Sequence, residues 1–235
     1  MNWWVESHPR KVHALGKRAF YTPRTADVLG LGDRGTRCRT CPAFDRCDHR
    51  LDISADEALD ALYLQGEETS SYIRDACVFA EDITIEDTMQ VQIEYENEVT
   101  CNYTLTADSP WKGLEIRFHG TKGELSHRHV EVHGVFAGER KRAIDDNVFT
   151  ELHLSGEHPR QIDVWEGKGT HGGADHIMLG YLFAPETMPK HIYNRRSDYI
   201  SGTWSILTGI AANESIPTGR AVDVGAMLDD ASIAI

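Results

Sequence analysis

Alternation of apolar and polar residues over residues 80–166 constrains the fold of this chain more than any other feature. In DITIEDTMQVQIEYENEVTCNYTLTAD, apolar side chains recur at every second position on both sides of EYENE. Such alternation predicts strands with one buried and one polar face, and two of them around a short polar turn form a β-hairpin. The alternation continues in GLEIRFHGTKGELSH, HVEVHGVF, TELHLSG and RQIDVWEG, with a tight turn at GTKG. The sequence therefore predicts a meander of antiparallel strands.

The segments that flank these strands predict helices. SADEALDALYLQG has Ser54 as a candidate N-cap, Glu57 three residues later as in a capping box, and Gly66 as a candidate stop. THGGADHIMLGYLFAP and DYISGTWSILTGIAANESIPTG have apolar residues at helical spacing, and Pro217 and Gly219 mark the end of the second helix. VESHPRKVHALGKRAF predicts a strand or a sheet edge, and VDVGAMLDDASIAI a short strand or tail. The expected class is α+β: an open, predominantly antiparallel sheet with helices packed on one face, in a single domain over residues 1–235.

Charge and hydropathy restrict the partners of the chain. A formal net charge of −13 at pH 7 disfavours non-specific binding to nucleic acid and to anionic membranes. No apolar run approaches the ~20 residues that a membrane-spanning helix needs, and the first residues lack the pattern of a signal peptide. We therefore expect a cytoplasmic protein with no nucleic-acid partner and no membrane partner.

Three cysteines crowd into CRTCPAFDRC, within the Gly- and Arg-rich stretch at about residues 22–50. A C-x2-C pair can place two thiolates on one tetrahedral ion, and a third thiolate nearby strengthens the prediction of a metal site. His49 or Cys77 could be the fourth ligand, and Cys77 is better placed, where the helical and strand regions join. The predicted ligands of a structural zinc are Cys38, Cys41, Cys47 and Cys77. Two alternatives stay open: reduced, partly buried thiols, or a disulfide from Cys38 to Cys41 or Cys47.

The stretch GTHGGADH places His171, Asp175 and His176 around two glycines at the start of a predicted helix. Glycine lets the backbone approach a ligand closely, and a histidine with an aspartate could bind a polyol or move a proton. A capping turn, with Asp175 bonded to helix amides and His171 bonded locally, is the interpretation that residue types alone favour. No G-x-G-x-x-G fingerprint follows a predicted strand, as a dinucleotide site needs, and no Walker phosphate loop occurs in the sequence.

Other histidines are scattered along the predicted strands. Alternate spacing puts His127 and His129 on one face of a strand, and His133 could join them. An exposed polar sheet face is the favoured interpretation of this group.

Several stretches, taken in order, resemble the C-terminal half of the glucose–fructose oxidoreductase / inositol dehydrogenase / MocA family. The most specific are HGTKGEL and, much later, GTHGGAD and GIAANESIPTG. NWWVESHPRKVHALG, CRTCPAFDRC and the hairpin stretch follow the same order, so the resemblance covers nearly the whole chain. It implies an open antiparallel sheet that covers a substrate site and builds homodimers or homotetramers through its flat face.

The resemblance also implies a chemistry. Family members are NAD(P)-dependent oxidoreductases of sugars, inositols, glycosides and related polyols, in which an N-terminal Rossmann domain binds NAD or NADP. That domain and its EKP lysine have no counterpart here, so the catalytic residues are expected in a missing upstream half, with Trp3 and Trp4 at the joint. His171, Asp175 and His176 are the substrate-side residues that the resemblance carries over, and it reverses the preference for a mere capping turn at His171 and Asp175.

Two functions are therefore expected. In the first, the chain is the substrate-binding and oligomerisation domain of an NAD(P)-dependent oxidoreductase that oxidises a secondary alcohol of a sugar, glycoside or polyol by hydride transfer. Alone, it would then neither turn over substrate nor bind NAD tightly. In the alternative, it is a stand-alone, non-catalytic assembly or scaffold subunit braced by a structural zinc loop.

Overall fold

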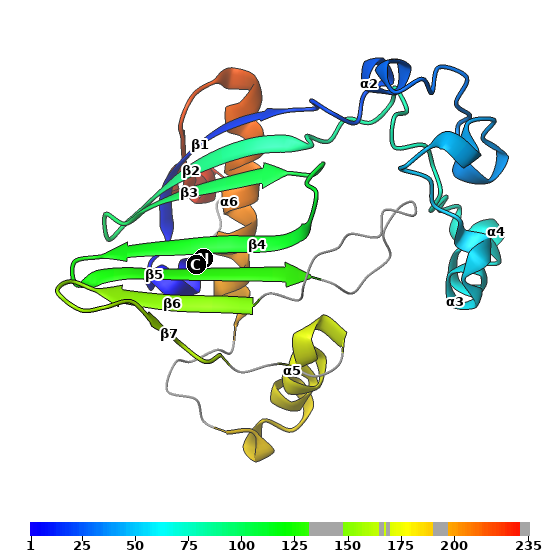
Figure 1. The fold of residues 1–235 in the computed structure, drawn as a ribbon. Helices are drawn as coiled ribbons and strands as arrows, with labels where there is room; N and C mark the ends of the chain where they lie inside the picture. Colours follow the sequence, from blue (N-terminus) through cyan, green and yellow to red (C-terminus); the bar gives the residue numbers. More distant parts are fainter. Residues whose placement is uncertain (132–147, 165–166, 168–169, 190–196, 231–235) are drawn as a thin grey trace.

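The computed structural model describes residues 1–131, 148–164, 167, 170–189 and 197–230. Within them, the strands form two four-stranded antiparallel sheets, of order β3-β2-β1-β8 and β4-β5-β6-β7, with helix α6 running behind them (Figure 1). The strands are β1 (Pro9–Lys17), β2 (Thr88–Tyr95), β3 (Thr100–Thr106), β4 (Lys112–Gly120), β5 (Gly123–Glu131), β6 (Val148–Leu154), β7 (Arg160–Gln161) and β8 (Val222–Asp223). The predicted α+β class with open antiparallel sheets is confirmed, and hydrogen bonding divides the expected single sheet into two.

The two longest described helices are the ones that apolar spacing predicted after the strands. α6 begins after Asp198, whose carboxylate accepts the Ser201 N–H (2.8 Å), and ends at Gly219, whose φ is 63°. None of the described helices is both long and apolar enough to cross a membrane. The α-helices are α1 (Asn2–Val5), α2 (Pro23–Val28), α3 (Glu57–Leu59), α4 (Glu67–Ser70), α5 (Ala174–Phe183), α6 (Tyr199–Thr218) and α7 (Val224–Asp230). The segment for which a short strand or tail was predicted begins with the short strand β8 and continues as helix α7.

The helix predicted around residue 57 differs from expectation at its start. Asp56 caps it instead of Ser54, because the Asp56 carboxylate accepts the N–H groups of Ala58 (2.9 Å) and Leu59 (3.0 Å). A carboxylate forms charge-assisted hydrogen bonds, which are stronger than those of a hydroxyl. After α3 the chain passes into a π-helical turn (Asp60–Leu64) before α4.

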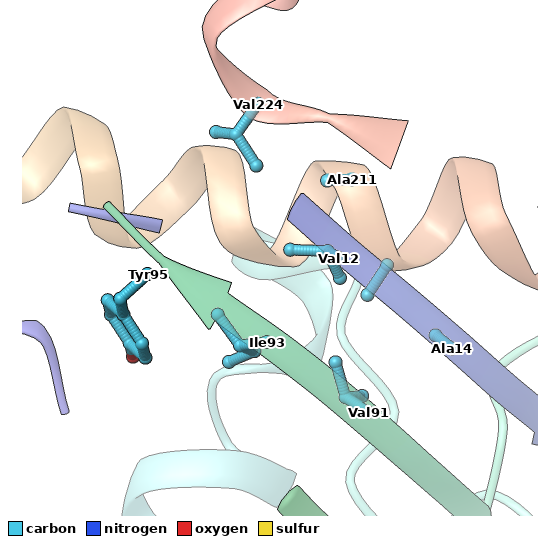
Figure 2. Close-up of a cluster of buried hydrophobic side chains, with 8 residues drawn as sticks. Val12, Ala14, Val91, Ile93, Tyr95, Ala211 and Val224 are labelled. Atoms are coloured by element: carbon cyan, nitrogen blue, oxygen red, sulfur yellow. The ribbon is translucent and has the colours of Figure 1, made fainter. Parts of the chain in front are cut away.

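The main core lies between the first sheet and α6 (Figure 2). Small residues let α6 approach β1 closely: the fully buried Ser215 hydroxyl accepts the Ala14 N–H (2.8 Å) and donates to the Arg220 carbonyl (2.6 Å). β1 pairs with both β2 and β8, so it is an interior strand. The buried members of this core are Val12, Ala14, Val91, Ile93, Tyr95, Ala211, Ala212 and Val224.

Between β1 and β2 the chain forms a lobe, residues 18–87, that lies to one side of the sheets (Figure 1). Helix α2 lies in the stretch whose turn residues suggested only a loop. The Thr22 hydroxyl caps this helix by accepting the Thr25 N–H (3.1 Å), and Pro23 occupies the first helical position, where its missing N–H costs nothing. The buried core cluster of the lobe consists of Ala26, Leu31, Ala43 and Phe79.

The second sheet carries two histidines of β5 on a half-buried face. The rings of His127 and His129 lie 6.5 Å apart, and His127 Nδ1 lies 2.8 Å from the hydroxyl of the buried Thr150 on β6. Burial, and then the nearby His129, lower the pKa of His127 below its usual 6.5. The favoured interpretation of an exposed face is therefore wrong for these two histidines, while His133 lies outside the described residues.

Candidate functional site

His171 and Asp175 meet at the start of α5. A 3-10 turn (Thr170–Gly173) leads into the helix, and both His171 (φ 49°) and Gly173 (φ 77°) adopt left-handed backbone conformations. Glycine adopts this conformation readily, whereas a non-glycine residue there costs about 1–3 kcal/mol. The turn brings His171 Nδ1 to 3.0 Å and 2.9 Å from the two carboxylate oxygens of Asp175.

This pairing decides how the imidazole is presented. When Nδ1–H donates to the Asp175 carboxylate, the outer ring nitrogen Nε2 is left as an acceptor in the neutral ring. The His171 side chain is 81% exposed and that of Asp175 43% exposed, so the pair is open to a ligand from solvent. Such a pair can accept a hydrogen bond from a polyol hydroxyl or hold a proton.

His176 is not brought to this pair. It follows Asp175 directly, and successive α-helical residues project about 100° apart around the axis. Its side chain is exposed. Substrate binding by His171, Asp175 and His176 stays a prediction, and the structure brings the first two together.

The four predicted metal ligands line one small cavity in the lobe. An isolated antiparallel bridge between Arg37 and Ala76 aligns the segment of Cys38 with that of Cys77. Its hydrogen bonds run from the Cys38 N–H to Asp75 O (2.8 Å) and from the Cys77 N–H to Thr36 O (2.9 Å). The cavity is bordered by Cys38, Cys41, Cys47 and Cys77, together with His49, the other candidate ligand.

An ion network that sequence reasoning missed anchors this bridge. Arg37 Nη2 contacts both Asp75 Oδ1 and Glu67 Oε1 at 2.5 Å, and Asp75 also accepts the Arg39 N–H (2.9 Å). Burial raises the pKa of Asp75, but the hydrogen bonds from Arg37 and Arg39 lower it by a larger amount. The net pKa is therefore below the usual 3.8. No local signal marks this network, because Arg37 lies 30 or more residues from both carboxylates.

The cysteines of the lobe are present as thiols, and neither of the alternative disulfides is formed. Burial raises the pKa of the Cys38 and Cys47 thiols. Across the described part of the chain, no group of three or more His, Cys, Asp or Glu side chains is already placed to hold a metal ion. The predicted zinc thus stays a prediction that the shared cavity makes testable.

The described strands do not have the arrangement of a Rossmann-type dinucleotide site. Every strand pair that the structure describes is antiparallel. Dinucleotide binding of the Rossmann type needs parallel strands joined through a glycine-rich turn and a helix.

Comparison with known proteins identifies the fold. Residues 3–224 match the family described as "Oxidoreductase family, C-terminal alpha/beta domain". The chain belongs to this oxidoreductase family. The match spans nearly the whole chain, so this oxidoreductase-family domain includes both sheets and the cysteine-containing lobe, and the resemblance found in the sequence is confirmed.

Relatives of this oxidoreductase-family domain are about twice its length. A protein of Bacillus subtilis (strain 168) named as an oxidoreductase, YteT, is 28% identical over 220 residues, which are 89% of this chain and 49% of that protein. The chain thus spans about half the length of that curated relative. Among solved structures, an aldose-aldose oxidoreductase from Caulobacter crescentus complexed with glycerol matches with a TM-score of 0.48 and 12% identity, over 94% of this chain and 43% of that one. An oxidoreductase from Agrobacterium radiobacter in complex with NAD+, L-tartaric acid and magnesium matches with a TM-score of 0.46 and 13% identity, over 97% of this chain and 46% of that one.

Proposed function

We propose that this chain is the substrate-binding and oligomerisation part of an NAD(P)-dependent oxidoreductase that acts on a sugar, glycoside or polyol. The observation that carries the proposal is the family match over residues 3–224, together with a curated relative about twice as long. In the whole protein, the dinucleotide would be bound outside the residues described here. A secondary alcohol would lose its carbinol hydride to the nicotinamide and its hydroxyl proton to a base, which leaves a ketone. Self-association into dimers or tetramers through the sheet is part of the same proposal.

The pair of His171 and Asp175 is the group in this chain best suited to hold the substrate. The outer imidazole nitrogen and the carboxylate are acceptors of the kind that bind the hydroxyl groups of a polyol. Their spacing is set by the left-handed turn before α5 and does not depend on the ligand. A preformed pair of acceptors lowers the entropy cost of binding a flexible hydroxylated ligand.

The test uses the complete product of the reading frame that contains this chain, assayed for NAD+ and NADP+ reduction with a panel of sugars and polyols. We expect His171→Gln and Asp175→Asn each to lower kcat/KM for the best substrate by roughly 10- to 100-fold, because a hydrogen bond to a charged group contributes about 1.5–3 kcal/mol. The KM for the nicotinamide should not change. His158→Gln, an exposed histidine of the turn after β6, is the matched control and should behave as the wild type.

Two outcomes would count against this assignment. A complete product that binds neither NAD+ nor NADP+ would favour the scaffold alternative over an enzyme. Unchanged kcat/KM in both variants of an active enzyme would remove the substrate role of the pair but leave the oxidoreductase intact.

A further inference from the structure

The lobe of residues 18–87 has a small apolar core for its length. Its buried cluster holds Ala26, Leu31, Ala43 and Phe79, of which two are alanines, with Phe20 and Tyr21 partly buried against it. Among the other apolar side chains of the lobe, Ile53 is buried. Protein segments with so little buried apolar surface usually need a cross-link or a metal to hold one structure. The described cysteines form no disulfide that could serve this purpose.

The chain arranges four thiols where a metal would supply such a link. Cys41 follows Cys38 in a tight turn closed by the Cys41 N–H and the Cys38 carbonyl (3.0 Å). A second turn brings in Cys47, whose N–H donates to Phe44 O (3.2 Å). The bridge of residues 37 and 76 adds Cys77 from a segment almost forty residues later. The cavity that these four side chains border has a volume of about 20 Å³, which is enough for one ion.

Backbone donors point at two of the sulfur atoms of this cavity. The Gly35 N–H donates to Cys41 Sγ (3.3 Å) and the Leu51 N–H to Cys38 Sγ (3.4 Å). A neutral thiol is a weak acceptor, whereas the thiolate that coordinates a metal is a strong one. Two of the four sulfurs thus already have the amide donors that stabilise a thiolate ligand.

We propose that Cys38, Cys41, Cys47 and Cys77 bind one zinc ion that fastens the loop of residues 35–50 to the segment of residues 75–79. Four thiolates form a closed tetrahedral site, so its role is structural and no position is left for substrate or water. Soft thiolate ligands favour zinc among the common divalent ions. The sulfurs move inward from their described positions on binding, since they are not yet placed as a cage. This proposal stands apart from the oxidoreductase function and does not depend on it.

The test measures metal content and affinity in the full chain. The wild type, purified without chelator, should contain about one zinc per chain by elemental analysis. Cys77→Ser should lower the zinc affinity, measured in competition with a chromophoric chelator, by more than about 100-fold. The loss of a direct ligand should exceed the roughly 10- to 100-fold loss of metal affinity that follows when only a hydrogen-bond partner of a ligand is removed. Cys101→Ser is the matched control, since Cys101 lies on β3 outside the cavity, and it should keep wild-type affinity.

Cobalt replacement in the wild type gives a readout that does not depend on whether variants fold. Four thiolates should produce intense sulfur-to-cobalt charge-transfer absorption and the visible bands of tetrahedral cobalt. Chelation should speed tryptic cleavage within residues 18–87, and added zinc should reverse this. Purified protein that takes up neither zinc nor cobalt overturns the proposal, as does bound iron with visible absorption. Retention of zinc in Cys77→Ser but not in His49→Gln would overturn the four-thiolate ligand set.

Discussion

Asp87 joins the two ends of the lobe, and its removal should release the lobe from the sheet. The carboxylate is 5% exposed and accepts three successive backbone N–H groups, from Ala19 (2.7 Å), Phe20 (2.8 Å) and Tyr21 (2.8 Å). It also accepts the Thr88 hydroxyl (3.0 Å). The chain leaves β1 at these amides and returns to β2 at Asp87, so one side chain fastens the exit to the return.

The magnitude follows from the number and kind of these bonds. Each hydrogen bond to a charged group contributes about 1.5–3 kcal/mol, and three neighbouring bonds add less than their sum. We expect Asp87→Ala to destabilise the attachment of the lobe by about 3–5 kcal/mol, because three backbone donors then lose their acceptor. Asp87→Asn keeps one carbonyl acceptor and loses the charge, so its cost should be about 1–3 kcal/mol.

The two parts of the protein can be followed separately. All five tryptophans lie outside residues 18–87, so tryptophan fluorescence during urea unfolding reports the sheet region, while trypsin cleaves the arginine-rich lobe. A loss of about 2 kcal/mol should raise the rate of tryptic cleavage in the lobe of Asp87→Asn by roughly 30-fold. Asp82→Asn, at an exposed aspartate of the same lobe, is the control and should leave the rate unchanged.

The effect of Asp87 should also depend on pH. Burial raises the pKa of Asp87, but the hydrogen bonds from the N–H groups of Ala19, Tyr21 and Phe20 lower it by a larger amount. The net pKa is therefore below the usual 3.8. Because the folded-state pKa is depressed, the stabilisation is fully present above about pH 4 and is lost as the pH falls through the folded-state pKa. The difference between wild type and Asp87→Asn should therefore be constant near neutral pH and shrink in acid. Equal tryptic cleavage of the two proteins at neutral pH would refute the reasoning.

Two further perturbations test the packing. Ser215→Ala should lower the free energy of unfolding by about 1–3 kcal/mol in urea titration, because the buried Ala14 N–H loses its acceptor; a change below about 0.5 kcal/mol would contradict this. Gly209→Ala and Gly123→Ala should have opposite effects on the melting temperature. An alanine at 209, in α6, meets open space and gains about 1 kcal/mol of helix propensity, whereas a Cβ at 123 would lie 2.1 Å from the His153 carbonyl oxygen at φ 155°. Equal changes of melting temperature in the two variants would show that helix propensity at position 209 and the steric clash at position 123 do not control stability.

Part of the candidate sites could be predicted because their members are close in sequence. His171 and Asp175 are only four residues apart, so the sequence already placed both at the start of the predicted helix, but the left-handed turn at His171 and Gly173 is what brings them into contact. The C-x2-C pair is equally local. The fourth thiol, Cys77, was chosen from its place along the chain, and the bridge of residues 37 and 76 now gives a structural reason for that choice.

The sequence by itself determined the class of the fold and the family. A period of two marks strands, apolar spacing marks helices, and the order of several short stretches marks the oxidoreductase domain, since each of these signals depends only on neighbouring residues or their order. Only the tertiary structure decided that the strands divide into two sheets, that His127 faces Thr150 and is half-buried, and that Asp87 and Arg37 hold the lobe. These features join residues 23 to 68 positions apart, and such pairings depend on how the whole chain packs and leave no periodic mark in the sequence.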